Sequence, residues 1–317
     1  MECHDHPPIV SVCHLPLECP TLARMQQVTY ATTCTVVCKF CGSDKVVKNG
    51  VRTGDIQYYK CRNCGRAFAG NNATEGMQYP SEQIAAAVSL FYDGLSIDAI
   101  RRQLDSLYHV YPSDSTVYDW TVRYTKLAVD NAKFSNIRVG SVWTADESVL
   151  MLDQHVKVWF WDIIDSETRF LLASHMSITR GTKDAQILMQ KAWERAQKTP
   201  RIIYTDKLAA YLDGIELTFG ADTKHKQGGP FDVGNNTNLI ERFHGTIKAR
   251  TKVMRGMRNR ETARVVMDGW LINYNFFRPH ESLSNKTPGE VAHASFPWKS
   301  WLDVVRANKP EIQTCAK

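Results

Sequence analysis

Three acidic residues have the types and the spacing to bind divalent metal ions. Asp146 and Asp206 each stand at the polar end of an apolar run, in VWTAD and IIYTD, as side chains at a strand end do. Glu241 follows Asp206 after 34 intervening residues and opens a helical pattern. Hard oxygen ligands on rigid elements suit Mg²⁺ or Mn²⁺ beside phosphates, and two such ions can clamp an in-line displacement at phosphorus. The predicted chemistry is metal-assisted phosphoryl transfer.

Each of these carboxylates also has a structural interpretation. Asp146 could end a strand, Asp206 could cap a helix, and Glu241 could be a solvated position near a helix N-terminus. Taken singly, each carboxylate fits its structural interpretation better, so a catalytic site requires that the three act together. The neighbouring acids are interpreted as surface or structural residues: Glu147, Asp153, Asp162 and Asp165.

Four cysteines form two closely spaced pairs, Cys38 with Cys41 and Cys61 with Cys64, and 19 residues lie between the pairs. This spacing is typical of a four-thiolate zinc site, although four unrelated reduced thiols are the alternative. The intervening residues read as two short strands, 46–51 and 56–59. Such a hairpin buries too little surface to fold alone, so Zn²⁺ would stabilise it. We predict a zinc ribbon over residues 34–70 with a structural ion and with Cys34 as a spectator.

Residues 80–132 carry three helical patterns. Ser81 and Ser96 are expected to cap the first two helices, and Gly94 ends the first. The third pattern has an apolar face, and its opposite face carries Ser115, Thr116, Asp119 and Arg123. A helix-turn-helix that places Ser115, Thr116 and Arg123 in the major groove of DNA fits this arrangement. A plain three-helix module would show the same periodicity.

Residues 138–300 read as an α/β catalytic domain. Three strands at hairpin spacing are expected at 142–152, 156–164 and 170–176. A helix at 182–198, a fourth strand at 202–205, a helix that begins at 207–212 and a fifth strand at 215–219 are expected to follow. A last long helix is expected from Thr262 to about Phe276, with Trp270 and Tyr274 in the core. Arg278 and His280 follow it, and residues 301–317 read as a C-terminal tail.

Positive charge gathers in two segments. Residues 38–70 carry a net charge of +5 and residues 242–260 one of +7, whereas the whole chain carries +6. Lys248 and Lys252 lie at i+7 and i+11 from Glu241 and share its helix face, where Gly245 would let a backbone approach closely. A polyanion lying on this face explains the cations, although a solvated basic face remains the alternative. The predicted contacts to DNA in this segment are Lys248, Arg250, Lys252 and Arg255.

Composition narrows the class of protein further. A length of 317 residues is enough for two or three domains, and an apolar content of 43% supports hydrophobic cores. No apolar run approaches the ~18 residues of a membrane span. No signal peptide is visible, and nine cysteines fit a reducing compartment. Residues 1–33, rich in Cys and His, are expected to form a disordered tail, with a second metal site or initiation at Met25 as alternatives. No Walker-type or HExxH motif occurs, which argues against ATP-driven and peptidase mechanisms.

The contexts of Asp146, Asp206 and Glu241, the 34-residue interval and the later segment YNFFRPH resemble the insertion-sequence transposases of the DDE class. Within that class the chain is most similar to the insertion-sequence-six type, over about residues 34–305. The resemblance implies an RNase-H-like catalytic domain that cleaves DNA and transfers strands with two Mg²⁺ or Mn²⁺ ions. It also implies that Asp146 bridges both ions, while Asp206 and Glu241 each hold one.

Such an enzyme would act on double-stranded DNA, both the ends of its own element and a target, as a homodimer or larger assembly. We expect it in the cytoplasm of a prokaryote, associated with the nucleoid, with no membrane partner and no small-molecule substrate. A catalytically silent or domesticated DNA-binding regulator, which keeps the ribbon and the helices, is a different class of function. A plain RNase-H-like nuclease is a third, but the separate zinc and helical modules argue against it.

Overall fold

The structure is a computed structural model of the whole chain, and it describes residues 36–52, 56–70, 77–133, 135–152, 156–228, 238–253 and 260–307. The Cys/His-rich residues 1–33, Cys34 and Arg255 therefore lie outside the described residues. No helix in the described ranges has the length and apolar character to cross a membrane.

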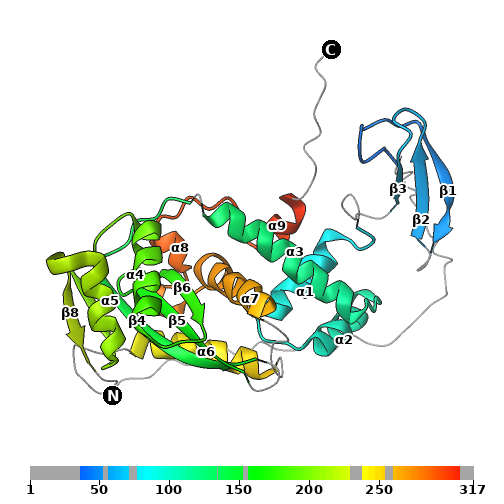
Figure 1. The fold of residues 1–317 in the computed structure, drawn as a ribbon. Helices are drawn as coiled ribbons and strands as arrows, with labels where there is room; N and C mark the ends of the chain where they lie inside the picture. Colours follow the sequence, from blue (N-terminus) through cyan, green and yellow to red (C-terminus); the bar gives the residue numbers. More distant parts are fainter. Residues whose placement is uncertain are drawn as a thin grey trace, which may run out of the picture. The chain divides into compact units, whose positions relative to one another are not determined.

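The predicted zinc ribbon contains an antiparallel sheet. Strands β1 (Val46–Arg52) and β2 (Ile56–Cys61) match the two predicted strands, and a third strand, β3 (Ala67–Ala69), pairs with β2 (Figure 1). Strand β3 was not predicted, because three residues are too few to show an alternating pattern. Phe68 of β3 is buried and stacks on Tyr59, with the ring centroids 5.9 Å apart. The ribbon thus has only a small apolar centre.

The three predicted helices are present as α1 (Ser81–Tyr92), α2 (Ile97–Tyr108) and α3 (Asp114–Ala132). Ser96 caps α2 as expected, since its hydroxyl accepts a hydrogen bond from the Ala99 N–H. The predicted cap at Ser81 is wrong: Pro80 occupies the N-cap position, no side chain caps the helix, and Ser81 is its first, buried residue.

A five-stranded sheet follows, with the order β6-β5-β4-β7-β8. Its strands are β4 (Val142–Met151), β5 (Lys157–Asp165), β6 (Leu171–Ser177), β7 (Ile202–Thr205) and β8 (Lys224–Gln227). The first three are antiparallel, as hairpin spacing predicted, and β7 and β8 run parallel to β4. The helices α4 (Thr182–Ala196) and α5 (Ala209–Phe219) connect the later strands. The mixed α/β architecture is confirmed.

The predicted fifth strand at 215–219 is wrong, because those residues complete α5. Tyr211, Ile215 and Phe219 are buried at intervals of four, which is the spacing of one helix face. The true fifth strand, β8, has the sequence KHKQ at the sheet edge and contains no apolar residue. A polar edge strand leaves no hydrophobic periodicity to detect.

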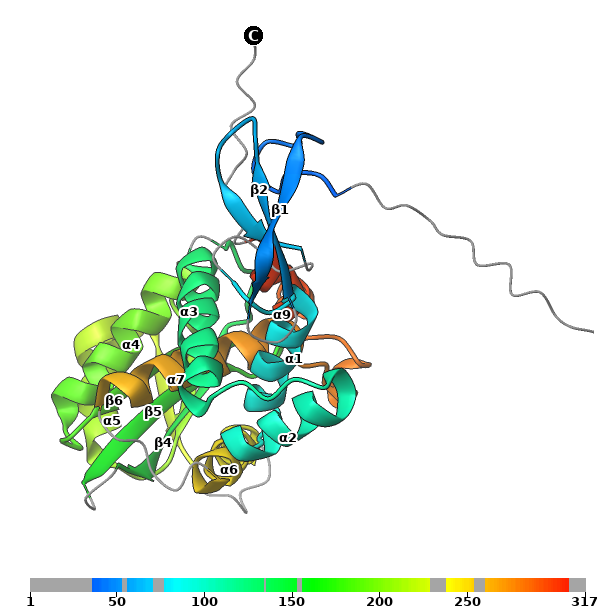
Figure 2. The ribbon, with the colours of Figure 1, turned by 90° about the vertical axis from the view of Figure 1, so that its right-hand side faces the viewer.

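Helices cover both faces of this sheet (Figures 1 and 2). Successive side chains on a strand point to opposite faces. Trp161 of β5 contacts Tyr211 of α5, and the next residue, Asp162, hydrogen-bonds to His244 of α6 (Asn238–Val253). The helix that carries Glu241 therefore lies on the face opposite α5.

The last long helix, α7 (Arg260–Ile272), continues into a π-helical turn at Asn273–Phe277. Trp270 and Tyr274 are both buried, so their predicted place in the core is confirmed. Residues 301–307, predicted as part of a tail, instead form α9, and the Trp301 ring stacks on Tyr92 of α1 at 5.0 Å. The remaining short elements are α8 (Pro288–Val291) and 3-10 turns at Gly220–Asp222 and Glu281–Leu283.

Candidate metal and nucleic-acid site

The sheet register brings two of the predicted ligands together. The parallel ladder between β4 and β7 pairs Val142 with Ile202 and Thr144 with Tyr204. Asp146 and Asp206 each stand two residues beyond the last of these pairs, at the same level of adjacent strands. An antiparallel or slipped pairing would have separated them.

The carboxylates of Asp146, Glu147 and Asp206 form one cluster, with an oxygen from each lying within 4.8 Å of the others. Ligands of one Mg²⁺, each about 2.1 Å from the ion, lie about 3–4 Å apart, so the donor set fits a hard divalent cation. Burial raises the pKa of Asp206, and the nearby Asp146 carboxylate raises it further. A bound cation would relieve this repulsion.

Glu147 is the unexpected member of the cluster, and its side chain is only 2% exposed. The Arg180 guanidinium donates to its Oε1 from Nε at 2.9 Å and also lies 3.9 Å from Oδ2 of Asp206. Arg180 in turn lies over the Trp159 ring, 4.5 Å from the centroid. Burial raises the pKa of Glu147, while Arg180 opposes that shift. Glu147 is thus a buried, ion-paired residue that also belongs to the carboxylate cluster, so its interpretation as a surface or structural residue stays a prediction.

His244 links the cluster to the sheet interior. Its Nδ1 lies 3.3 Å from Oδ2 of Asp146, and its Nε2 lies 2.9 Å from Oδ2 of the fully buried Asp162. Burial alone would lower the pKa of His244, but the hydrogen bonds with Asp146 and Asp162 raise it to about 9. A protonated His244 therefore holds the Asp146 carboxylate in one orientation. The Ser174 hydroxyl donates a hydrogen bond to the other carboxylate oxygen of Asp162, Oδ1.

Glu241 is not in the carboxylate cluster of the described residues. It is exposed in the first turn of α6, three residues before His244. Residues at i and i+3 lie on the same side of a helix. Because His244 contacts Asp146, α6 presents Glu241 on the side that faces the Asp146 end of β4.

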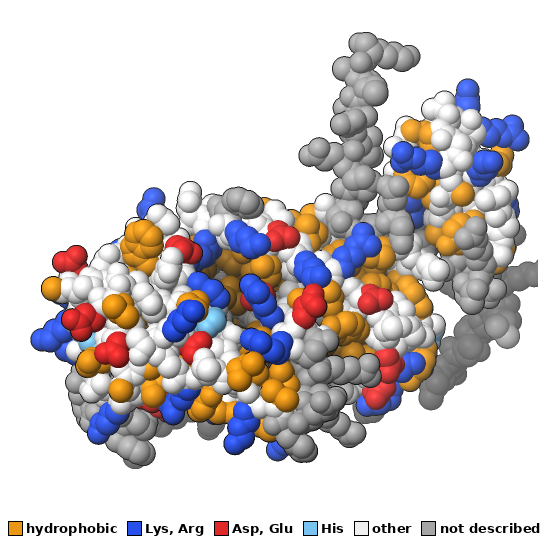
Figure 3. All heavy atoms as spheres, in the orientation of Figure 1, with side chains coloured by type: hydrophobic (Ala, Val, Ile, Leu, Met, Phe, Trp, Pro, Cys, Tyr) orange, Lys and Arg blue, Asp and Glu red, His pale blue; other side chains and the backbone are white. Residues whose placement is uncertain are grey.

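Most of the predicted DNA-contacting residues that the structure describes occupy exposed positions. Lys248 and Lys252 are exposed on α6, Ser115 and Arg123 are exposed on α3, and Thr116 is half-buried there. The hydroxyl of Ser113 accepts a hydrogen bond from the Thr116 N–H, which caps α3. The side chain of Arg250 and all of Arg255 lie outside the described atoms. In Figure 3 lysine and arginine side chains are spread over the ribbon and gather around a hollow over α4 and α7.

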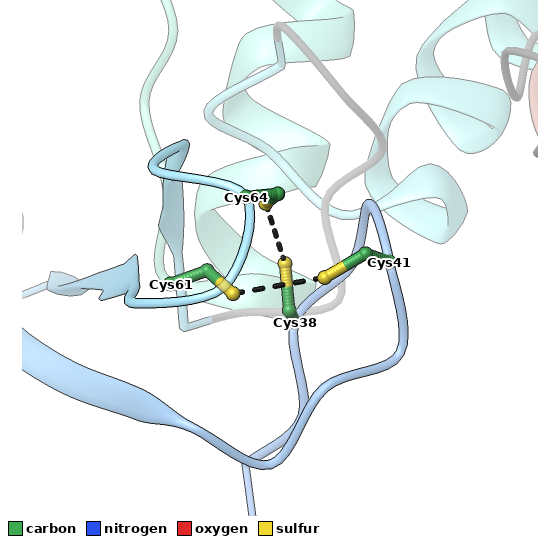
Figure 4. Close-up of side chains that lie close together, drawn as sticks. All are labelled: Cys38, Cys41, Cys61 and Cys64. Carbon is green, nitrogen blue, oxygen red and sulfur yellow. Dashed lines mark hydrogen bonds between the residues drawn. The ribbon is translucent and has the colours of Figure 1, made fainter.

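The structure also brings the four predicted zinc ligands together (Figure 4). The Sγ atoms of Cys38 and Cys64 are 3.6 Å apart, and so are those of Cys41 and Cys61. Four sulfurs at ~2.3 Å from one tetrahedral zinc ion lie about 3.8 Å from one another, so the cluster has the right size. Backbone N–H groups of Cys64 and Asn63, together with the thiols of Cys41 and Cys38, lower the pKa of Cys61 to about 6, whereas burial raises the pKa of Cys38 to about 12. Cys61 is therefore the cysteine that most readily supplies a thiolate, the form that binds metal.

Sequence reasoning missed the supporting residues of the carboxylate site. His244 lies at i+3 from Glu241, a spacing that places both on one side of a helix. The predicted contacts on that side were only the basic residues at i+7 and i+11. Arg180 lies in the connection between β6 and α4, and its partners come from strands far away in the chain. No local pattern could reveal it.

Comparison with known proteins gives a family match over residues 140–280, to a DDE domain of the IS240 type. Among solved structures, the HTLV-2 integrase catalytic core domain in complex with magnesium has a TM-score of 0.39 and 16% identity, covering 50% of this chain and 99% of that one. The BIV integrase catalytic core domain has a TM-score of 0.36 and 13% identity, and the match covers 49% of this chain and 94% of that one. A chain of the simian T-cell lymphotropic virus intasome has a TM-score of 0.39 and 13% identity, and the match covers 68% of this chain and 77% of that one. No curated protein matches.

The matched segment begins just before β4 and ends at His280, so it contains Asp146, Glu147, Asp206 and Glu241. These residues lie in a mixed α/β core. The chain thus carries a DDE domain, and the protein is an enzyme of the polynucleotidyl transferase class to which DDE transposases and integrases belong.

Proposed function

We propose that this protein is a DNA transposase, of the insertion-sequence-six type, that binds the ends of its own element and cleaves and joins DNA strands. The observation that carries the proposal is the alignment of Asp146 and Asp206 by the parallel β4–β7 register, inside a segment that matches a DDE domain. The zinc ribbon and the helix-turn-helix over α1–α3 would recognise the element ends. Two such ends must meet during transposition, so a homodimer or larger assembly is part of the proposal.

The proposed ligands are Asp146, shared by two Mg²⁺ or Mn²⁺ ions, with Asp206 and Glu241 each completing one ion's set. The ions would activate water or a 3′-hydroxyl and neutralise the leaving oxygen at phosphorus. His244 orients Asp146 through its hydrogen bond, and Asp162 fixes the ring from behind. Lys248 and Lys252 would contact the DNA backbone along the Glu241 side of α6. Cys38, Cys41, Cys61 and Cys64 would hold a structural Zn²⁺.

A strand-nicking and strand-transfer assay tests this proposal. The substrate is duplex DNA from the sequences that flank the gene, with Mg²⁺ or Mn²⁺, and the proteins are wild type, Glu241→Gln and Asp206→Asn. We expect site-specific cleavage by wild type and a loss of at least about 100-fold in both variants, the order of effect seen when a stabilising group of the transition state is removed. Asp222→Asn, which changes an exposed acid in the turn after α5, is the control and should keep full activity.

The same assay with Glu147→Gln decides which acid is the third ligand. Activity retained in Glu147→Gln and lost in Glu241→Gln supports Glu241, and the reverse pattern assigns the role to Glu147. Specific binding without cleavage by wild type would instead favour the DNA-binding regulator. Cleavage without any preference for the element ends would favour a plain nuclease.

A further inference from the structure

A second polar pocket lies beside α6, apart from the carboxylate cluster. It has a volume of about 260 Å³ and is formed by the turn between β5 and β6, by α6 and by the chain that follows the π-helical turn. Its lining includes Arg169, Arg242, Thr246, Arg278, His280 and Glu281. Three guanidinium groups thus share one small pocket with one carboxylate.

The positive charge of this pocket is not neutralised by ion pairs. Neither Arg169, Arg242 nor Arg278 has an ion-pair partner within 4 Å among the described residues. Burial raises the pKa of Tyr274 to about 12, and Arg169 and Arg278 both oppose that shift, so the two cations act at one place. Glu281 in the lining and Asp93, which interacts electrostatically with Arg278, offset part of this charge. Three clustered guanidinium groups still repel each other unless a further anion joins them.

An unsatisfied polar atom points to the same conclusion. The Nε2 atom of His280 is buried and has no hydrogen-bond partner in the part of the chain that the structure describes, while its ring packs edge-on against Tyr274 at 4.6 Å. Burial lowers the pKa of His280, and Arg278 and Arg169 lower it further. An anion between these arginines would reverse their effect, and the protonated Nε2 could then donate to one of its oxygens.

The pocket is held together by an internal clamp. The buried Asn275 side chain accepts a hydrogen bond from the Leu171 N–H at 2.8 Å and donates one to the Leu171 carbonyl at 2.9 Å. This pair ties the segment that carries Arg278 to the turn that carries Arg169. Because the backbone at these two positions is already fixed, an anion that binds there has to order only the arginine side chains.

The position of the pocket separates it from the metal site. On α6, Glu241 and His244 lie one turn apart on the side that meets Asp146, whereas Arg242 and Thr246 line the pocket on another side. A helix with its side chains is about 10 Å across. A group bound in the pocket is therefore a different group from one bound at the carboxylate cluster. A DNA strand that crosses α6 would reach both.

We propose that the pocket formed by Arg169, Arg242, Arg278 and His280 binds one phosphate group of the DNA backbone, outside the scissile position. The inference rests on the proposed function, because it names DNA as the ligand. Planar guanidinium groups bind phosphate oxygens in pairs, so two arginines are expected to hold the same phosphate.

The test measures how the affinity for an element-end duplex depends on salt concentration. Arg242→Gln, Arg278→Gln and the double variant are compared with wild type, and Lys224→Gln, an exposed cation on β8, is the control. Each bound phosphate contributes a slope of about −0.9 in log affinity against log salt. We expect each single variant to weaken binding, and the double variant to lose one phosphate's slope, about 0.9, rather than two. Both arginines are accessible to solvent, and unchanged unfolding midpoints would show that the variants fold.

The outcomes separate the pocket from the proposed function. If wild type and the double variant bind DNA with the same salt slope and both cleave it, the pocket proposal is overturned while the transposase proposal stands. If wild type shows no salt-dependent DNA binding, both fail together. A titration with inorganic phosphate, followed by ³¹P line broadening, is the last arm: binding lost in the double variant with no change in the DNA slope would make the pocket a small-anion site, which also overturns the proposal.

Discussion

His244 is the residue on which the geometry of the candidate site depends most. Its ring connects the Asp146 carboxylate to the buried Asp162, so the two acids and the imidazole form one hydrogen-bonded chain. Histidines and carboxylates behind a ligand commonly fix its orientation. We expect His244→Gln to reduce the affinity for Mn²⁺ about 10- to 100-fold, measured by titration of the free protein. An unchanged affinity would remove His244 from this role.

His244 also predicts how stability depends on pH. Its pKa is raised to about 9 from an ordinary value of 6.5, so its contribution is fully present below pH 6.5 and is lost as the pH rises through 9. A shift of this size corresponds to about 3 kcal/mol. In buffer without divalent metal, the unfolding free energy of wild type should therefore fall relative to His244→Gln between pH 6.5 and 9. Parallel urea-denaturation profiles of the two proteins would contradict this.

The ion pair of Glu147 and Arg180 gives a second prediction for single residues. Arg180→Gln leaves a buried carboxylate without its counter-charge, and we expect a loss of about 2 kcal/mol, below the usual range of about 3–5 because Arg180 is 37% exposed. Glu147→Gln combined with Arg180→Gln should recover most of that loss. A double-mutant cycle in urea measures the coupling, and simple additivity would show that the pair does not stabilise the fold.

Among the elements, the zinc ribbon is the one whose stability we expect to depend on an ion. Its described core centres on Phe68, too little apolar surface for an independent fold. Removal of Zn²⁺ with a chelator should therefore unfold residues 38–69, seen as a collapse of amide chemical-shift dispersion, and weaken DNA binding. Cys38→Ser should abolish zinc retention, measured by elemental analysis, whereas Cys34→Ser should retain one ion per chain. Zinc retained equally by both variants would reject the four-cysteine site.

Elements with strong periodicity could be predicted from the sequence, and those defined by long-range contacts could not. The strands that carry Asp146 and Asp206 are recognisable by apolar runs that end in an acid. Strand β8 is formed by its parallel pairing with β7. Because all of its residues are polar, its sequence has no hydrophobic periodicity. In the site, the two aspartates were found from their contexts. The pairing of Glu147 with Arg180 was not, because it spans 33 residues and joins different elements.

At the scale of the molecule, the helices α1 and α3 pack directly on α7. Gly269 of α7 lies so close to Tyr92 of α1 that a Cβ there would overlap the tyrosine hydroxyl and approach Thr125 of α3 at 2.9 Å. We expect Gly269→Ala to destabilise the protein by about 1–3 kcal/mol, seen as a lower unfolding midpoint. Tyr92→Phe in the same chain should restore part of the loss.

The matched control for this substitution is Gly245→Ala. Gly245 lies within α6, and a methyl group added there would meet no described atom within 4 Å apart from its own helix backbone. Alanine at this position should therefore stabilise the helix by about 0.5–1 kcal/mol. Destabilisation of similar size at both positions would mean that the contact between α1 and α7 is not the cause.

The close contact at Gly269 limits which parts of the chain can be replaced by those of another protein. Swapping the three helices for those of another DNA-binding protein would bring in side chains that do not match the surface of α7, and the hybrid would lose its shared core. A chimaera joined after residue 133 should therefore fold poorly, whereas one joined between residues 70 and 77 keeps that core and exchanges only the ribbon. New target specificity is thus easier to graft in front of the helices than in place of them.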